Sequence, residues 1–86
     1  MIIYKISDSI VFNTLKNIKY GFLEITKIDG QILKFGNPED SLKVSLTIKD
    51  ESLTYNLIKS GSIGLGESYM KDFFITNNLS DLIELT

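Results

Sequence analysis

The chain of 86 residues contains no cysteine, histidine, arginine or tryptophan, and only one proline. Without cysteine it forms no disulfide and offers no thiolate to a metal, and without histidine it lacks the commonest metal ligand and general base. The absence of arginine removes the side chain that most often clamps phosphate or reads guanine. We therefore expect no transition-metal site and no histidine-based catalysis.

Excess positive charge and long apolar runs are also lacking. Nine lysines against eleven acidic residues give a net charge of -2, so nucleic acid is not an expected partner. No apolar run approaches the ~18 residues of a membrane span, and Lys5 and Asp8 interrupt the isoleucine-rich start. The sequence thus predicts neither a transmembrane helix nor a signal peptide, and the expected location is cytoplasmic.

The composition that remains is typical of one small globular domain. Hydrophobic residues make up 43% and charged residues 23%, and no repeat, low-complexity tract or linker divides residues 1–86. Residues 9–19 carry apolar positions at helical spacing: Val11, Leu15 and Ile18. A second stripe, Ile3, Ile6 and Ile10, lies on a different side. Residues 2–8 therefore either extend this helix, which would be buried on two sides, or form a separate element.

The middle of the chain predicts strands. Residues 20–28 and 31–35 are rich in β-branched and aromatic side chains, and Asp29-Gly30 between them favours a hairpin with a two-residue type I′ turn. Residues 42–48 alternate apolar and polar, as a strand with one buried face does. Because the linking loops are short, we expect a three-stranded antiparallel meander covered by helices on its apolar face.

The last third predicts shorter elements. Asp50 is placed to cap a helix that ends at Gly61, and a short helix is expected from Glu67 to Lys71. Residues 73–76 would add a fourth, edge strand, and Asn78 would cap a final helix. The fold class is therefore α+β, with a three- or four-stranded sheet. Since no stop signal precedes Thr86, we also expect the chain to be a fragment.

Candidate chemical groups are few. Gly61, Gly64 and Gly66 follow a predicted helix in the order Gly-x-x-Gly-x-Gly. The dinucleotide-binding fingerprint instead follows a strand and reads Gly-x-Gly-x-x-Gly, so the spacing argues against a nucleotide site. Glu67 has no second carboxylate nearby, and an acid in a first helical turn gains about 0.3–1 kcal/mol from the dipole without any function. The serines have no histidine to activate them. We predict no catalytic, cofactor-binding or metal-binding residue in this chain.

Four large side chains gather within six positions: Tyr69, Met70, Phe73 and Phe74. Such residues suit a lipid groove or a subunit contact, but in a small domain they more often form the core. Of the four, Tyr69 is the one expected to use its polar end, because a buried phenol needs a hydrogen-bond partner.

The run Gly64-Leu65-Gly66-Glu67-Ser68-Tyr69-Met70 resembles the signature of the N-terminal accessory domain of cyclopropane-fatty-acyl-phospholipid synthases, which are S-adenosylmethionine-dependent lipid methyltransferases. The resemblance covers about residues 12–86 and includes Asp29-Gly30 and Phe35-Gly36. Lys71-Asp72 stands where that family usually has Asp-Gly, and Phe74 where it often has Trp. The order of elements is also similar to that of sterol carrier protein domains.

The resemblance implies a non-catalytic module of an enzyme that transfers a methylene group from S-adenosylmethionine to unsaturated phospholipid acyl chains. It implies that the cofactor belongs to a following methyltransferase domain that residues 1–86 lack, and that the module aids lipid presentation or dimerisation, in the cytoplasm or at the inner face of the membrane. The alternatives are a free-standing lipid-binding domain and a homodimeric interaction domain. The expected lipid or interface contacts are Gly64, Leu65, Gly66, Glu67, Tyr69, Met70, Phe73 and Phe74.

Overall fold

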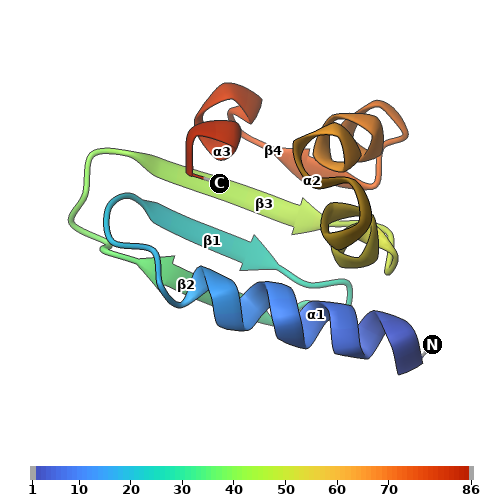
Figure 1. The fold of residues 1–86 in the computed structure, drawn as a ribbon. Coiled ribbons are helices and arrows are strands. Elements are labelled where there is room, and N and C mark those ends of the chain that lie inside the picture. The colour runs from blue at the N-terminus through green and yellow to red at the C-terminus, as the bar shows by residue number, and fades with distance from the viewer. Residues whose placement is uncertain (1, 86) are drawn as a thin grey trace.

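The computed structural model describes residues 2–85, and for Ser62 only the backbone. Its elements are α1 (Ile2–Leu15), β1 (Phe22–Thr26), β2 (Ile32–Gly36), β3 (Lys43–Ile48), α2 (Leu53–Met70), β4 (Phe74–Thr76) and α3 (Leu79–Leu85). The strands form one sheet, with α1 on the β2 side and α2 and α3 on the β4 side (Figure 1). The predicted α+β class and the fourth strand are confirmed.

The β1–β2 hairpin is present as predicted, with Leu23 opposite Phe35 and Ile25 opposite Leu33. Its turn differs from the expected type I′. The N–H of Lys27 donates to the carbonyl of Gln31, so three residues, 28–30, form the loop. Only Gly30 among them has a positive φ, of 91°. A type I′ turn needs positive φ at both central positions, which a three-residue loop ending in glycine avoids.

The sheet is mixed and follows the order β2-β1-β3-β4, instead of a meander. β3 pairs with β1 in parallel, with Leu23 opposite Val44 and Ile25 opposite Leu46. The connection from β2 therefore crosses over the start of β1. The alternation in residues 42–48 predicts the strand and its buried face. The same face would be buried whether β3 paired antiparallel with β2, as in a meander, or parallel with β1, so the pattern does not determine which strand lies beside β3.

Backbone contacts at Gly21 fix this crossover. The carboxylate of Asp40 accepts the N–H of Gly21 at 2.9 Å and that of Leu42 at 2.9 Å, and the N–H of Asn37 donates to the carbonyl of Gly21 at 2.9 Å. A Cβ on Gly36, whose φ is 89°, would clash with the Gly21 carbonyl oxygen. Only glycine at position 36 permits this close approach.

Residues 2–8 belong to α1, which settles the alternative left open by the sequence. The Ile3, Ile6 and Ile10 stripe is 41%, 55% and 51% exposed, so the helix is buried on one side only. On its inner side, Phe12 stacks on Phe35 with 6.2 Å between ring centroids. Helical spacing alone cannot tell which of two apolar stripes faces the sheet.

α2 consists of two helical segments that meet at a kink at Gly61, and it departs from prediction at its start and immediately after Gly61. It begins at Leu53 after the cap residue Ser52, and Asp50 lies two positions earlier, where its carboxylate accepts the N–H of Ser52 at 2.9 Å. Gly61 has the positive φ expected of a helix C-terminus, 56° with ψ -133°. The helix then resumes at once after Gly61, so the predicted helix start at Glu67 is wrong.

The C-terminal elements agree with prediction. β4 pairs antiparallel with β3 as an edge strand, and the side chain of Asn78 accepts the N–H of Asp81 at 3.0 Å, which caps α3. Asp72 makes the turn before β4 with a φ of 60°. The far face of β3 is exposed through Lys43, Ser45 and Thr47, whereas the helix-side face supplies much of the core.

Candidate functional site

The segment singled out by the sequence, Gly64–Phe74, divides between core and surface. Leu65 and Phe74 are only 3% and 2% exposed. Gly64 is buried where the second half of α2 meets the first, and a Cβ there would clash with the carbonyl oxygen of Asn56. These three predicted contact residues therefore hold the domain together and are not available to a partner.

Glu67 lies near the C-terminal end of α2, where its backbone carbonyl accepts the N–H of Lys71 at 3.1 Å. The expected first-turn role is wrong, because a negative charge near a helix C-terminus is not favoured by the dipole. Its side chain is exposed. Gly66, one residue earlier, is partly exposed, and an added Cβ would meet nothing within 4 Å.

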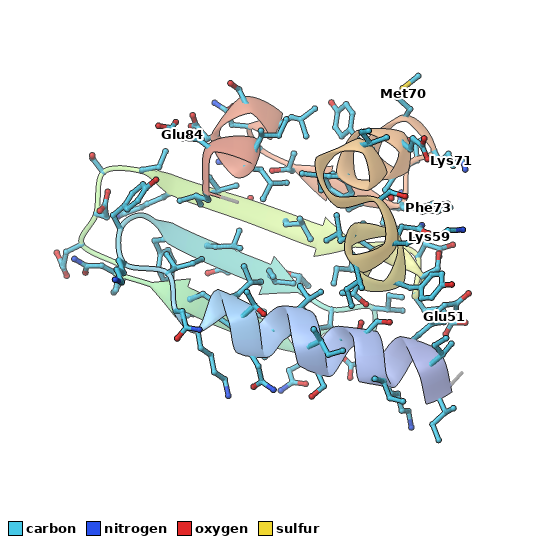
Figure 2. The ribbon with its side chains drawn as sticks, in the orientation of Figure 1. Glu51, Lys59, Met70, Lys71, Phe73 and Glu84 are labelled. Atoms are coloured by element: carbon cyan, nitrogen blue, oxygen red, sulfur yellow. The ribbon has the colours of Figure 1, made fainter. Side chains whose placement is uncertain are left out.

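Three residues at helical spacing form an exposed face on the second half of α2: Ile63, Gly66 and Met70. We call this set the α2 face. Ile63 is 72% and Met70 84% exposed, and the Met70 side chain points away from the body of the domain (Figure 2). Beside it, Tyr69 is 43% exposed and packs its ring 5.7 Å from that of Phe74.

Phe73 is half-buried and fixes the end of the segment. Its carbonyl accepts the N–H groups of Lys49 and Asp50, at 2.8 and 3.1 Å. The ammonium of Lys71 lies 5.9 Å from the centre of the Phe73 ring, within cation–π range. The segment is thus anchored at Phe73 and Phe74, while Glu67, Tyr69 and Met70 remain on the surface.

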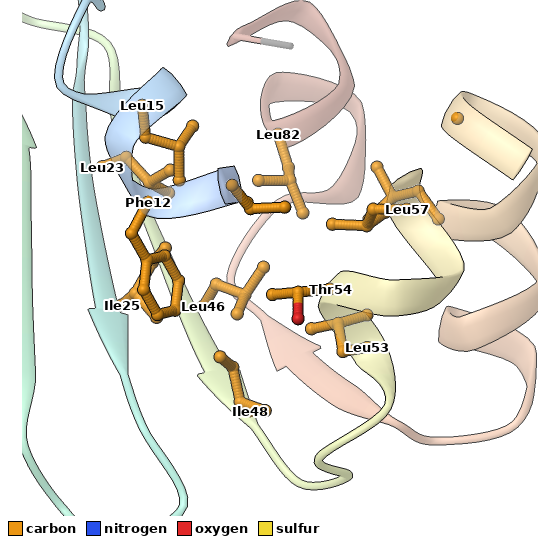
Figure 3. A pocket seen from close by; sticks show the side chains of 13 residues that line it. Phe12, Leu15, Leu23, Ile25, Leu46, Ile48, Leu53, Thr54, Leu57 and Leu82 are labelled. Atoms are coloured by element: carbon orange, nitrogen blue, oxygen red, sulfur yellow. The ribbon is translucent and has the colours of Figure 1, made fainter. Parts of the chain in front are cut away.

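Between the helices and the sheet lies an apolar cavity of ≈ 260 Å³, partly open to solvent. The described side chains that converge on it come from α1, β1, β3, α2 and α3 (Figure 3): Val11, Phe12, Leu15, Leu23, Ile25, Leu46, Ile48, Leu53, Thr54, Leu57, Leu65 and Leu82. Gly61 completes the wall. We call this space the cavity.

A space of this size is costly if nothing fills it. In another protein, destabilisation rises by about 24 cal/mol per Å³ of unfilled core volume. At ≈ 260 Å³, this gives an upper bound of about 6 kcal/mol. The whole stability of a small domain is only about 5–15 kcal/mol. An apolar molecule in the cavity would therefore stabilise the fold appreciably.

Thr54 is the one residue among the described lining that brings a polar side chain to the cavity. It is 2% exposed, and its hydroxyl donates to the carboxylate of Asp8 at 2.5 Å. The same threonine, with Ile48 and Leu53, also borders a second cleft, whose lining includes charged residues. The charged residues of that cleft are Lys5, Asp8, Lys27, Asp29, Asp50 and Glu51.

Four carboxylates against two lysines make this neighbouring space, which we call the acidic cleft, negative by two charges. Within it, hydrogen bonds from the side chain and then the backbone of Ser52 hold the pKa of Asp50 below its ordinary value of 3.8. Asp50 therefore stays ionised at neutral pH. The sequence did not point to Thr54 or Asp8; the available signal was a threonine placed between Leu53 and Leu57 in an apolar stripe.

Residues 2–85 contain no group of three or more carboxylates that could hold a metal ion. In that same part of the chain, no helix is both long and apolar enough to cross a bilayer. What the arrangement offers chemically is apolar contact, at the cavity and at the α2 face.

A family model described as a domain of unknown function (DUF7884) matches residues 10–86, which is most of the chain. No curated protein and no solved structure matches the chain.

Proposed function

The chain belongs to the DUF7884 family, and we propose that its domain is the non-catalytic accessory module of a cyclopropane-fatty-acyl-phospholipid synthase. The parent enzyme would transfer a methylene group from S-adenosylmethionine to unsaturated phospholipid acyl chains. Its methyltransferase domain would bind the cofactor. The module would act in the cytoplasm or at the inner face of the membrane, by helping to present phospholipid or to dimerise the enzyme.

The observation that carries this proposal is how the Gly64–Met70 run is built into the fold. Gly64 lets the two halves of α2 touch, and Leu65 anchors the second half in the core. The side chains of Glu67, Tyr69 and Met70 are displayed on the helix, with Met70 84% exposed. Exposed methionine on a fixed support is well suited to an apolar contact that must adapt to its partner. The run thus supports docking by shape and apolar contact, without bond making.

A graft tests this role. Residues 2–85 would replace the accessory domain of a cyclopropane-fatty-acyl-phospholipid synthase, and methylene transfer from S-adenosylmethionine into phospholipid vesicles would be measured. We expect the graft to retain activity. Met70→Asp in the graft should reduce it, whereas Ile28→Asp, on the 58% exposed Ile28 of the β1–β2 turn, should not. A graft without activity, or one indifferent to Met70→Asp, would contradict the proposal.

The cavity favours one alternative function, a free-standing lipid-binding domain. Such a domain would carry lipid by itself and would need no methyltransferase partner. It would extract acyl chains from vesicles in proportion to protein concentration, and the graft would be inactive. A homodimeric interaction domain, the other alternative, would sediment as a dimer, and Met70→Asp would convert it to a monomer.

A further inference from the structure

We propose that the cavity binds the alkyl chain of a single-chain amphiphile whose head is not anionic, with the head beside Thr54 at the edge of the acidic cleft. The inference concerns the isolated domain and does not depend on the accessory role. The binding site is assembled from side chains of α1, both central strands, α2 and α3 (Figure 3).

The size of the cavity favours a single hydrocarbon chain as its occupant. In another protein an apolar cavity of about 150 Å³ stays dry and accepts benzene. By proportion, ≈ 260 Å³ has room for about ten carbon atoms. A partner helix or strand would be far too wide to enter, so a flexible hydrocarbon is the occupant that fits. Leu46, Leu57 and Leu82 approach this space from three different elements.

The charges of the acidic cleft favour a ligand whose head group is not anionic. Thr54, Ile48 and Leu53 line both the cavity and the acidic cleft, so the proposed chain would pass between these three side chains to place its head in the cleft. Four carboxylates and two lysines line the described part of that cleft. A carboxylate head placed there would be repelled, whereas an ammonium or hydroxyl head would not. The Asp8 carboxylate, which lines the cleft, accepts the hydroxyl of Thr54, which lines the cavity.

Three ligands of equal chain length test both parts of the proposal. The folded chain would be titrated with decylammonium, decan-1-ol and decanoate below their micelle-forming concentrations, with the methyl signals of Leu and Ile followed by NMR. We expect saturable shifts at Leu46, Leu57 and Leu82, and none at the exposed Ile32 and Ile75. Decanoate should bind about fivefold or more weakly than decylammonium. Shifts spread over exposed methyl groups would overturn the site, and equal affinities would overturn the choice of head.

Matched variants locate the binding. Leu57→Trp fills the cavity and should abolish saturable binding, whereas Ile58→Trp, at the adjacent and 50% exposed position, should preserve it. Glu51→Gln should strengthen decanoate binding. Glu39→Gln, in the β2–β3 crossover and outside both spaces, should not.

Unchanged binding in a folded Leu57→Trp protein would refute the site. If that variant does not fold, the pattern of methyl shifts in the unaltered chain decides. Because these titrations use the isolated domain and the graft measures methylene transfer, either proposal can fail alone.

Discussion

Gly64 in the second half of α2 lies directly against the backbone carbonyl of Asn56 in the first half. The contact is between backbones, so no side-chain movement can relieve a methyl group added at Gly64. We expect Gly64→Ala to lower the free energy of unfolding by about 1–3 kcal/mol, as overpacking does. Urea denaturation followed by circular dichroism measures the change.

Gly66→Ala is the matched control. A Cβ at Gly66 meets nothing within 4 Å, and alanine is about 0.5–1 kcal/mol better than glycine inside a helix. This substitution should therefore stabilise the domain. Equal effects of the two substitutions would show that the two halves of α2 do not touch at Gly64.

Removing two buried hydroxyl groups, those of Ser68 and Thr54, should change the stability of the domain in opposite directions. Ser68 is 1% exposed and its hydroxyl has no hydrogen-bond partner among the described residues, so Ser68→Ala should raise stability by about 0.5–1 kcal/mol. The Thr54 hydroxyl donates to Asp8, so Thr54→Val should lower stability by about 0.5–1.5 kcal/mol. Thermal and urea unfolding of both variants provide the measurement, and destabilisation by Ser68→Ala would indicate an unseen partner.

The crossover should make stability depend on pH through Asp40. Backbone N–H groups of Leu42 and then Gly21 donate to its carboxylate and hold the pKa of Asp40 below its ordinary value of 3.8. A lowered folded-state pKa contributes stability that is complete above the unfolded value and is lost as pH falls through the folded value. Asp40→Asn should therefore unfold at lower urea than the original chain at neutral pH. The two midpoints should converge below the folded-state pKa; a difference that persists there would contradict this account.

Phe74 belongs to the buried part of the Gly64–Phe74 segment and Met70 to its exposed part, so their substitutions should affect stability differently. Phe74 is 2% exposed, and Phe74→Ala should cost about 3–5 kcal/mol of unfolding free energy. Met70 is 84% exposed, and Met70→Ala should change stability by less than about 0.5 kcal/mol. A large loss of stability from Met70→Ala would place this side chain in the core and remove it from any docking surface.

Local sequence signals predicted the elements well where one short motif determines the structure. Asp29-Gly30 marked the hairpin, the alternation over residues 42–48 marked β3, and Asn78 marked the start of α3. Each signal acts within a few residues, so no tertiary information is needed.

The remainder depends on contacts between distant residues. The parallel β1–β3 pairing is fixed by Asp40 and Gly36 against Gly21, which lies more than a dozen positions away. The sequence predicted a helix end at Gly61 and a new helix only from Glu67, but packing of Gly64 on Asn56 and of Leu65 in the core outweighs the poor helix propensity of the glycines between them. The cavity lies where side chains from five elements leave space between them, and no local sequence pattern predicts such a space.

The central claim is that Met70 is displayed for contact with the rest of a lipid-modifying enzyme or with its phospholipid. The chain has only two methionines, so the Met70 methyl group gives an easily resolved NMR signal. We would add the methyltransferase domain of a cyclopropane-fatty-acyl-phospholipid synthase, and separately phospholipid vesicles, to the labelled chain. The account predicts that at least one addition shifts or broadens the Met70 methyl signal in a saturable manner. A Met70 signal unchanged in position and width by both would contradict it.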